Sequence, residues 1–165
     1  RVPRQCEGVW AWEDRIMEVP SPEPPRISLA MDAQSLEKVK QLRRVKNRIE
    51  IDLFLLPAPV GEKGSRPVFP YVLMSVETQS GFVLGSEILA PEPSLEAMWG
   101  QIPQHVIKQL EIFGVLPEQI AVRLPLLLQL LQPLAKELGL KLKQSRTMRS
   151  LDAAKESMLG FMMQQ

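Results

Sequence analysis

The stretch "YVLMSVETQSGFVLGSEIL", Tyr71 to Leu89, decides the fold of this chain, because two apolar runs of strand length flank a polar turn in it. Gly81 supplies the positive φ that a short loop after "ETQS" requires. We therefore predict a β-hairpin over these residues. A hairpin of this kind needs a third strand to form a stable sheet.

The stretch just before the hairpin, "RIEIDLFLLPAPVG" at residues 48–61, predicts that third strand. Ile49, Ile51 and Leu53 alternate on one face, while Phe54 and Leu56 make the other face apolar further along. A strand that is apolar on both faces is typical of the buried centre of a sheet. We expect three consecutive antiparallel strands, with Ile51 and Leu53 in the sheet centre.

The residues after the hairpin alternate between helical and strand patterns. Ser94 is expected to cap a helix that ends at Gly114 and is kinked or broken at Gly100 and Pro103. A strand "QIAVRL" (119–124), a helix "PLLLQLLQPLAKELG" (125–139) with a kink at Pro133, and a strand "LKLKQS" (140–145) follow. A last helix is predicted directly after residue 150, with the serine there as its cap.

In front of residue 49 the pattern predicts a short strand "RISLAM" (26–31) and a helix over 33–45 that Asp32 caps. Residues 1–25 are expected to be an irregular arm and a linker, since "VPSPEPPR" places four prolines between positions 20 and 25. The predicted fold is thus a single α/β domain over 26–165. It has a mixed sheet of five or six strands with helices on both faces.

Composition excludes several classes of protein. The net charge is +1, from 20 Lys and Arg against 19 Asp and Glu, so no overall field attracts nucleic acid or an acidic membrane. The chain has neither a signal-peptide core nor an apolar run long enough to span a bilayer, and Cys6 is its only cysteine. We expect a cytoplasmic protein without disulfides. The chain begins with Arg, which is consistent with a piece of a longer gene product or a processed chain.

The order of elements from residue 49 onward resembles the ribonuclease H-like fold of retroviral integrases and many transposases. The most specific feature is "VLMSVETQSGFVLGSEIL", which is similar to the second and third strands of integrase-type cores; "EQIAVRLPLLLQLLQPLAKELGLKL" matches the later strand, helix and strand. The chain is also similar to uncharacterised bacterial domains that share "LPAPVGE" and "SGFVLGSE". The resemblance implies a ribonuclease H-like core over about 49–165.

Active members of that fold hold two divalent metals with carboxylates from the first strand, the fourth strand and a late helix. Asp52 stands where the first acid would fall, but Arg123 stands at the end of the fourth strand, where a cation would repel a metal. Asp152 and Glu156 are the late-helix acids, and helical geometry turns Glu156 toward water. We expect no metal, no cofactor and no catalytic residues. If the domain were active, Asp52, Asp152 and Glu156 would be its acids.

Two groups of basic residues are the candidates for nucleic-acid contact. The candidates are Lys38, Lys40, Arg43, Arg44, Lys46 and Arg48, expected on one helix, and Lys141, Lys143, Arg146 and Arg149 on and after the last strand. A solvated helix face explains the first group better, because no aromatic residues interleave there for base stacking. Lysines that protect an edge strand explain the second group equally well.

Trp10 and Trp12 are the candidates for contact with a protein partner. His105, the only histidine, has no evident Cys, Ser or Asp partner and is interpreted as a structural residue. The sequence favours a non-catalytic binding or accessory domain, slightly more with a protein partner than with nucleic acid. The alternatives are a divergent metal-dependent nuclease or transposase-like enzyme and a non-specific nucleic-acid binder. The sequence does not predict the oligomeric state.

Overall fold

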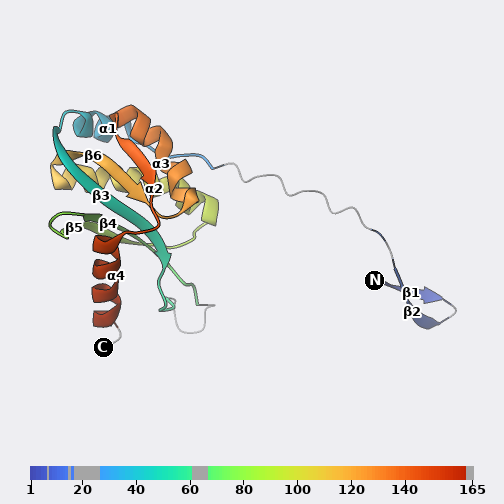
Figure 1. The fold of residues 1–165 in the computed structure, drawn as a ribbon. Helices are drawn as coiled ribbons and strands as arrows, with labels where there is room; N and C mark the ends of the chain where they lie inside the picture. Colours follow the sequence, from blue (N-terminus) through green and yellow to red (C-terminus); the bar gives the residue numbers. More distant parts are fainter. Residues whose placement is uncertain (7, 15, 17–26, 61–66, 163–165) are drawn as a thin grey trace.

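The computed structural model describes residues 1–6, 8–14, 16, 27–60 and 67–162 of the chain (Figure 1). The elements are β1 (Val2–Cys6), β2 (Val9–Glu13), α1 (Ala33–Lys40), β3 (Arg43–Leu55), β4 (Tyr71–Glu77), β5 (Val83–Leu89), α2 (Leu95–Phe113), β6 (Val115–Val122), α3 (Pro125–Leu138), β7 (Lys141–Gln144) and α4 (Arg149–Met162). No helix among the described residues combines the length and apolarity that a membrane span requires.

The five-stranded sheet is mixed and has the order β5-β4-β3-β6-β7. β4 is antiparallel to both of its neighbours, and β6 is parallel to both of its own. Ile51 in the central strand β3 lies opposite Ser75 of β4 and Val122 of β6. The prediction of an α/β domain with a mixed sheet, three antiparallel strands and Ile51 at its centre is therefore confirmed.

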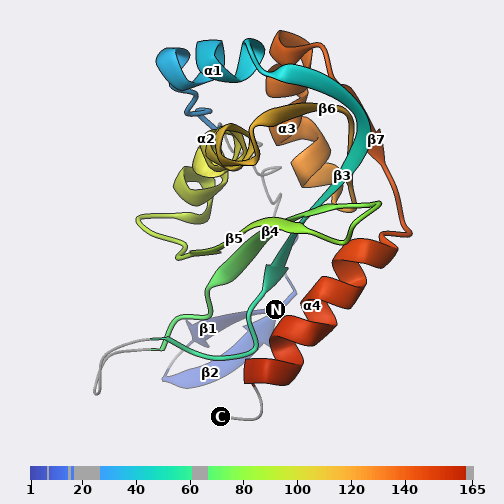
Figure 2. The ribbon, with the colours of Figure 1, turned by 90° about the vertical axis from the view of Figure 1, so that its left-hand side faces the viewer.

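Helices cover both faces of this sheet (Figure 2). Ile49, Ile51 and Leu53 belong to the larger core, which α1, α2 and α3 complete. Phe54 and Leu151 belong to a smaller core under α4. Full burial of one such side chain contributes about 1.5–3 kcal/mol. Because side chains alternate along a strand, the β3 residues between the three core aliphatics face α4, and this places two acids under that helix.

The turn and cap residues act as the sequence predicts. The side chains of Asp32 and Ser94 accept hydrogen bonds of 2.7 and 3.2 Å from the backbone N–H three residues later. Gly81, Gly114 and Gly139 have φ values of 70°, 74° and 63°, in the region that a side chain disfavours. These residues explain why the hairpin turns, and why α2 and α3 end, where they do.

The predicted strand over 26–31 is wrong for residues 27–31, which form no strand; residue 26 lies outside the described residues. The segment packs on α2 instead, where Ala30 N donates to Gly100 O at 2.8 Å. A side chain at Gly100 would collide with the carbonyl oxygen of Ser28, so the glycine permits this close approach. α2 runs through Gly100 and Pro103 as one helix, not two.

The helix predicted over 33–45 is also wrong at its end. α1 ends at Lys40, and β3 begins at Arg43. The backbone of residues 43–45 pairs with the start of β6, with Arg43 opposite Val115, and this tertiary pairing overrides the helical pattern of the local sequence. The first basic group is therefore divided between a helix and a strand.

The two segments β1 and β2 are not parts of an irregular arm, as predicted, but strands that pair in antiparallel orientation. Trp12 lies opposite Pro3, and Trp10 lies opposite Gln5. Most of the proline-rich linker predicted up to residue 25 lies outside the described residues.

Candidate functional site

The alternation of "RIEIDLF" delivers two acids, Glu50 and Asp52, to the face of the sheet that α4 covers. Both residues are buried, at 4% and 3% exposure. Asp52 Oδ1 accepts a 3.0 Å hydrogen bond from Leu53 N. A buried carboxylate needs further partners, because an isolated charge in the protein interior is costly.

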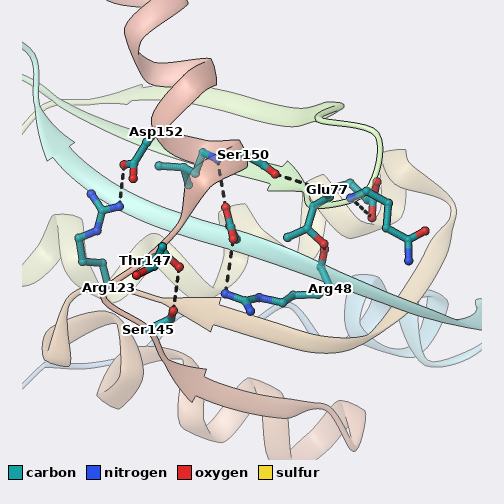
Figure 3. A network of polar contacts seen from close by, with 11 residues as sticks. Arg48, Glu77, Arg123, Ser145, Thr147, Ser150 and Asp152 are labelled. Carbon is teal, nitrogen blue, oxygen red and sulfur yellow. Dashed lines mark hydrogen bonds and ion pairs between the residues drawn. The ribbon is translucent and has the colours of Figure 1, made fainter.

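Arg123 is the partner of Asp52. It follows β6 directly, and its backbone is held by the end of β7, where Gln144 Nε2 donates to Arg123 O at 3.1 Å. The guanidinium lies between two acids, because Nη1 is 3.4 Å from Asp52 Oδ2 and Nη2 donates to Asp152 Oδ1 at 2.6 Å. Figure 3 shows the contact between Arg123 and Asp152. Arg123, at the end of the fourth core strand, therefore contacts both Asp52 of the first core strand and Asp152 of the last helix.

Glu50 fixes the start of α4, and the sequence reasoning missed this role. Glu50 Oε2 accepts from Leu151 N at 3.0 Å, and Oε1 lies 3.4 Å from Arg48 Nη2. The carboxylate thus satisfies a backbone N–H of the first turn and interacts favourably with the helix N-terminus. The signal was present in the sequence, since Glu50 shares the face of Asp52 by strand alternation.

Ser150 does not cap α4, contrary to the sequence prediction. The helix begins one residue earlier, at Arg149. The Ser150 hydroxyl donates instead to Thr78 O at 3.0 Å, in the β4–β5 turn (Figure 3). This bond and Glu50 together fix the first turn of α4, and so they direct Asp152 toward Arg123.

The charges around Asp52 act in opposite directions. Burial raises the pKa of Asp52 above its ordinary value, although the nearby cations Arg123 and Lys155 oppose this rise. The hydrogen bond to Asp152 raises the pKa of Arg123 above its ordinary value, so the guanidinium is charged at neutral pH. Lys155 Nζ lies 4.2 Å from the centre of the Phe54 ring, over the same face.

These residues do not fit the two-metal site of active ribonuclease H-like enzymes. Arg123 occupies the position between Asp52 and Asp152, and both carboxylates are engaged by it. Glu156 is exposed, as helical geometry predicts. Within the described ranges, no three or more Asp, Glu, His or Cys side chains form a group that could hold a metal ion.

In the first basic group, the two lysines on α1 are already paired. Lys38 Nζ lies 3.1 Å from Glu111 of α2, and Lys40 Nζ lies 2.8 Å from Glu37 in its own helix. Lys40 also reaches Glu137 of α3, at 3.3 Å. Both lysines therefore connect helices on the surface of the domain.

The basic residues on β3 have different surroundings. Arg44 donates to the carbonyl of Leu138 at 2.6 Å, at the end of α3, and Arg48 contacts Glu50. The side chains of Arg43 and Lys46 are exposed, and neither has a hydrogen bond or salt bridge within the described part of the chain. Lys46 does lie near Glu118, whose pKa is lowered by Lys141 and, to a smaller extent, by Lys46. These two are thus the members of the first basic group whose side chains form no hydrogen bond or salt bridge to a described residue.

The second basic group is exposed throughout, and the structure leaves most of it unpaired. Lys141 Nζ lies 2.6 Å from Glu118. Lys143, Arg146 and Arg149 have no ion pair to a described residue. β7 is a four-residue edge strand, so its exposed lysines also fit the protection of a sheet edge.

Two other candidates have clear positions. Trp10 and Trp12 lie on β2 with 67% and 70% exposure, and their spacing places them on one face of the strand.

His105 does have an acidic partner, which the sequence reasoning missed: its Nδ1 contacts Glu87 Oε2. Glu87 in turn accepts from Gln109 Nε2 at 3.1 Å, so this pair belongs to a polar network between β5 and α2.

Most of this domain matches the sequence model of a known family. Residues 35–159 match the sequence model of the family described as "Domain of unknown function (DUF6930)". The matched range includes the central strand, the hairpin and most of α4. No curated protein matches the chain.

Proposed function

The chain belongs to the DUF6930 family of domains of unknown function, and from its own geometry we propose that it is a non-catalytic binding or accessory domain. The observation that carries this proposal is the position of Arg123 between Asp52 and Asp152. At about 4 Å and an effective dielectric constant of ~20, one unit charge repels another by about 4 kcal/mol. A divalent cation beside this guanidinium would meet at least that cost.

The core of the domain is proposed to be ribonuclease H-like. The strand order β5-β4-β3-β6-β7, with β4 antiparallel and β3, β6 and β7 parallel, supports this topology. The covering of both faces, with α4 over the acids of β3, supports it further. In this interpretation Arg123 is an internal cation that takes the place of the metal. It connects Asp52 of β3 to Asp152 of α4.

The test is titration of the protein with Mn²⁺ by calorimetry, together with a nuclease assay on single- and double-stranded substrates. We expect no stoichiometric Mn²⁺ binding and no cleavage. Stoichiometric binding that disappears in the Asp52→Asn variant, together with cleavage that this substitution abolishes, would support a divergent metal-dependent nuclease instead. The Glu92→Gln variant is the matched control, because Glu92 is an exposed acid that is not among the three predicted metal ligands.

A protein partner is the second part of the proposal, and the exposed pair Trp10 and Trp12 supports it. Tryptophan is enriched at protein interfaces, where a rigid ring fills a pocket at low entropic cost. We expect such a complex to survive high salt and to be lost in a Trp10→Ala/Trp12→Ala variant. Ile16→Ala is the control, since Ile16 is 99% exposed and lies outside β2. Equal loss in both variants would exclude the tryptophan face.

A further inference from the structure

The two uncommitted cations of β3, Arg43 and Lys46, line the same hollow of about 530 Å³. The hollow lies on the part of β3 before Arg48, next to the β4–β5 turn. Glu77 also lines it, but its carboxylate is folded into the turn, where it accepts from Ser80 N at 2.7 Å. Neither cation forms a salt bridge among the described residues, so the hollow carries two positive charges against the one carboxylate of Glu77, and Glu118 lies near Lys46 in the adjoining hollow.

Aromatic rings stand beside these cations, which the sequence reasoning did not foresee. Phe82, after the turn, and Phe113, at the end of α2, both line the hollow. Their ring centres are 6.4 Å apart with an interplanar angle of 20°, and Phe82 is 59% exposed. In the folded domain, therefore, two aromatic rings do lie beside cations of the first basic group, where a base could stack.

The hollow continues around the turn in two directions. A second hollow shares Lys46 and Asn47 with it and extends to Arg48, and a third shares Ser80 and extends to Arg149 of α4. Asn47 Oδ1 is buried without a hydrogen-bond partner among the described residues. Such an oxygen is unsatisfied unless a bound group or water supplies a donor.

From this arrangement we propose that the face around the β4–β5 turn binds single-stranded nucleic acid. Phosphates lie against Arg43 and Lys46, with Arg149 on the far side of the turn, and a base stacks on the exposed ring of Phe82. A duplex hides its base faces, so the exposed ring selects single strands. This surface is separate from the Arg123 site, and the inference does not depend on whether that site is catalytic.

The test is fluorescence anisotropy of labelled oligonucleotides of about 12 nucleotides, within the usual site sizes of ~4–16. Single-stranded DNA and RNA and the matching duplexes are titrated with the 165-residue chain at low and high salt. We expect salt-dependent binding of single strands that exceeds binding of the duplexes. No single-strand binding at low salt, or tighter binding of the duplex, would overturn the proposal.

Two sets of variants separate stacking from charge. Phe82→Ala should weaken binding about tenfold, whereas Phe82→Trp should preserve it, because base stacking depends on an aromatic face. Arg43→Ala and Lys46→Ala should each lower the log–log salt slope by about 0.7, the value for one single-strand phosphate contact. Thermal unfolding followed by circular dichroism verifies that each variant is folded.

The matched controls lie away from the hollow. Phe161 of α4 is 66% exposed, similar to Phe82, and Lys108 of α2 is an exposed cation outside the hollow. Phe161→Ala and Lys108→Ala should leave affinity and salt slope unchanged. Equal losses in the control and hollow variants would contradict the proposed site. Binding of an acidic aromatic peptide in the absence of nucleic-acid binding would assign the hollow to a protein ligand instead.

Discussion

Arg123 and Asp152 join the end of β6 to the first turn of α4 through a 2.6 Å hydrogen bond, and the same guanidinium lies 3.4 Å from the buried Asp52. Arginine suits this position because its planar group carries several donors and a permanent charge. The guanidinium thereby compensates a carboxylate that would otherwise stand in the smaller core without a strong counter-charge. These side-chain contacts connect β3, the residue that follows β6, and α4.

The Arg123→Ala substitution should lower the free energy of unfolding by about 1–3 kcal/mol. Removing one partner of a buried ion pair costs ~3–5 kcal/mol, but solvent screens this pair, since the side chains of Arg123 and Asp152 are 30% and 45% exposed. Urea unfolding at neutral pH measures the change. Arg146→Ala, at an exposed position without an ion pair to any described residue, should change stability by less than about 0.5 kcal/mol.

The cost of Arg123→Ala should also depend on Asp52. In an Asp52→Asn background the buried charge is gone, so the same arginine substitution should cost clearly less. A double-mutant cycle from the four urea transitions gives this coupling. An equal cost in both backgrounds would show that Arg123 stabilises the fold without interacting with Asp52.

Asp52→Asn alone should raise stability at neutral pH. Burial raises the folded-state pKa of Asp52, so the folded protein binds its proton more tightly than the unfolded chain does. Stability from this group is therefore present below the ordinary value of 3.8 and is lost as the pH rises through the folded pKa. The gain from the asparagine should appear in urea unfolding at pH 7 and vanish at pH 3. A variant less stable than the parent at pH 7 would contradict this sign.

The fold could be predicted from the sequence where local periodicity and special residues agree. The alternation of Ile49, Ile51 and Leu53 predicts a strand, and Gly81, with its positive φ, predicts a tight turn. Prediction was wrong where a partner far along the chain decides the outcome. Residues 27–31 lie on α2, and the backbone from Arg43 pairs with β6, so local patterns that favoured another element were overridden.

The candidate sites show the same division. The chemistry of Asp52, Arg123 and Asp152 could be inferred one residue at a time, including the conflict between a cation and a metal. Their common contact could not, because it depends on how Glu50 fixes the start of α4. The Phe82 and Phe113 rings come from separate elements, and only the folded hairpin brings them beside the basic residues.

The Glu77→Gln substitution should lower the free energy of unfolding by about 1–2 kcal/mol at neutral pH, because hydrogen bonds to charged groups contribute ~1.5–3 kcal/mol each and glutamine keeps one acceptor. Burial alone would raise the pKa of Glu77, but hydrogen bonds from Ser80 and Gln79 together lower it below its ordinary value. This contribution is therefore present above pH 4.5 and is lost as the pH falls through the folded pKa.

Urea unfolding of the Glu77→Gln variant at pH 7 and pH 3 measures this effect. The difference from the parent should be large at pH 7 and small at pH 3. Glu156→Gln is the control, since the exposed Glu156 side chain has no hydrogen bond or ion pair within the described part of the chain. A Glu77→Gln loss that is the same at both pH values would show that shape, not charge, stabilises the turn.

The two helical glycines, Gly100 and Gly160, should respond in opposite directions to alanine. At Gly100 a Cβ would collide with the Ser28 carbonyl, a backbone atom that cannot move without the whole 27–31 segment, so Gly100→Ala should cost about 1–3 kcal/mol. At Gly160 no described atom outside the adjacent residues and the backbone of α4 lies within 4 Å of the new Cβ, and Gly160→Ala should stabilise α4 by about 0.5–1 kcal/mol. Thermal and urea unfolding of both variants measure the contrast. If Gly100→Ala were neutral, the 27–31 segment would not be docked on α2 in solution, and the hydrogen bond from Ala30 N to Gly100 O would not hold it.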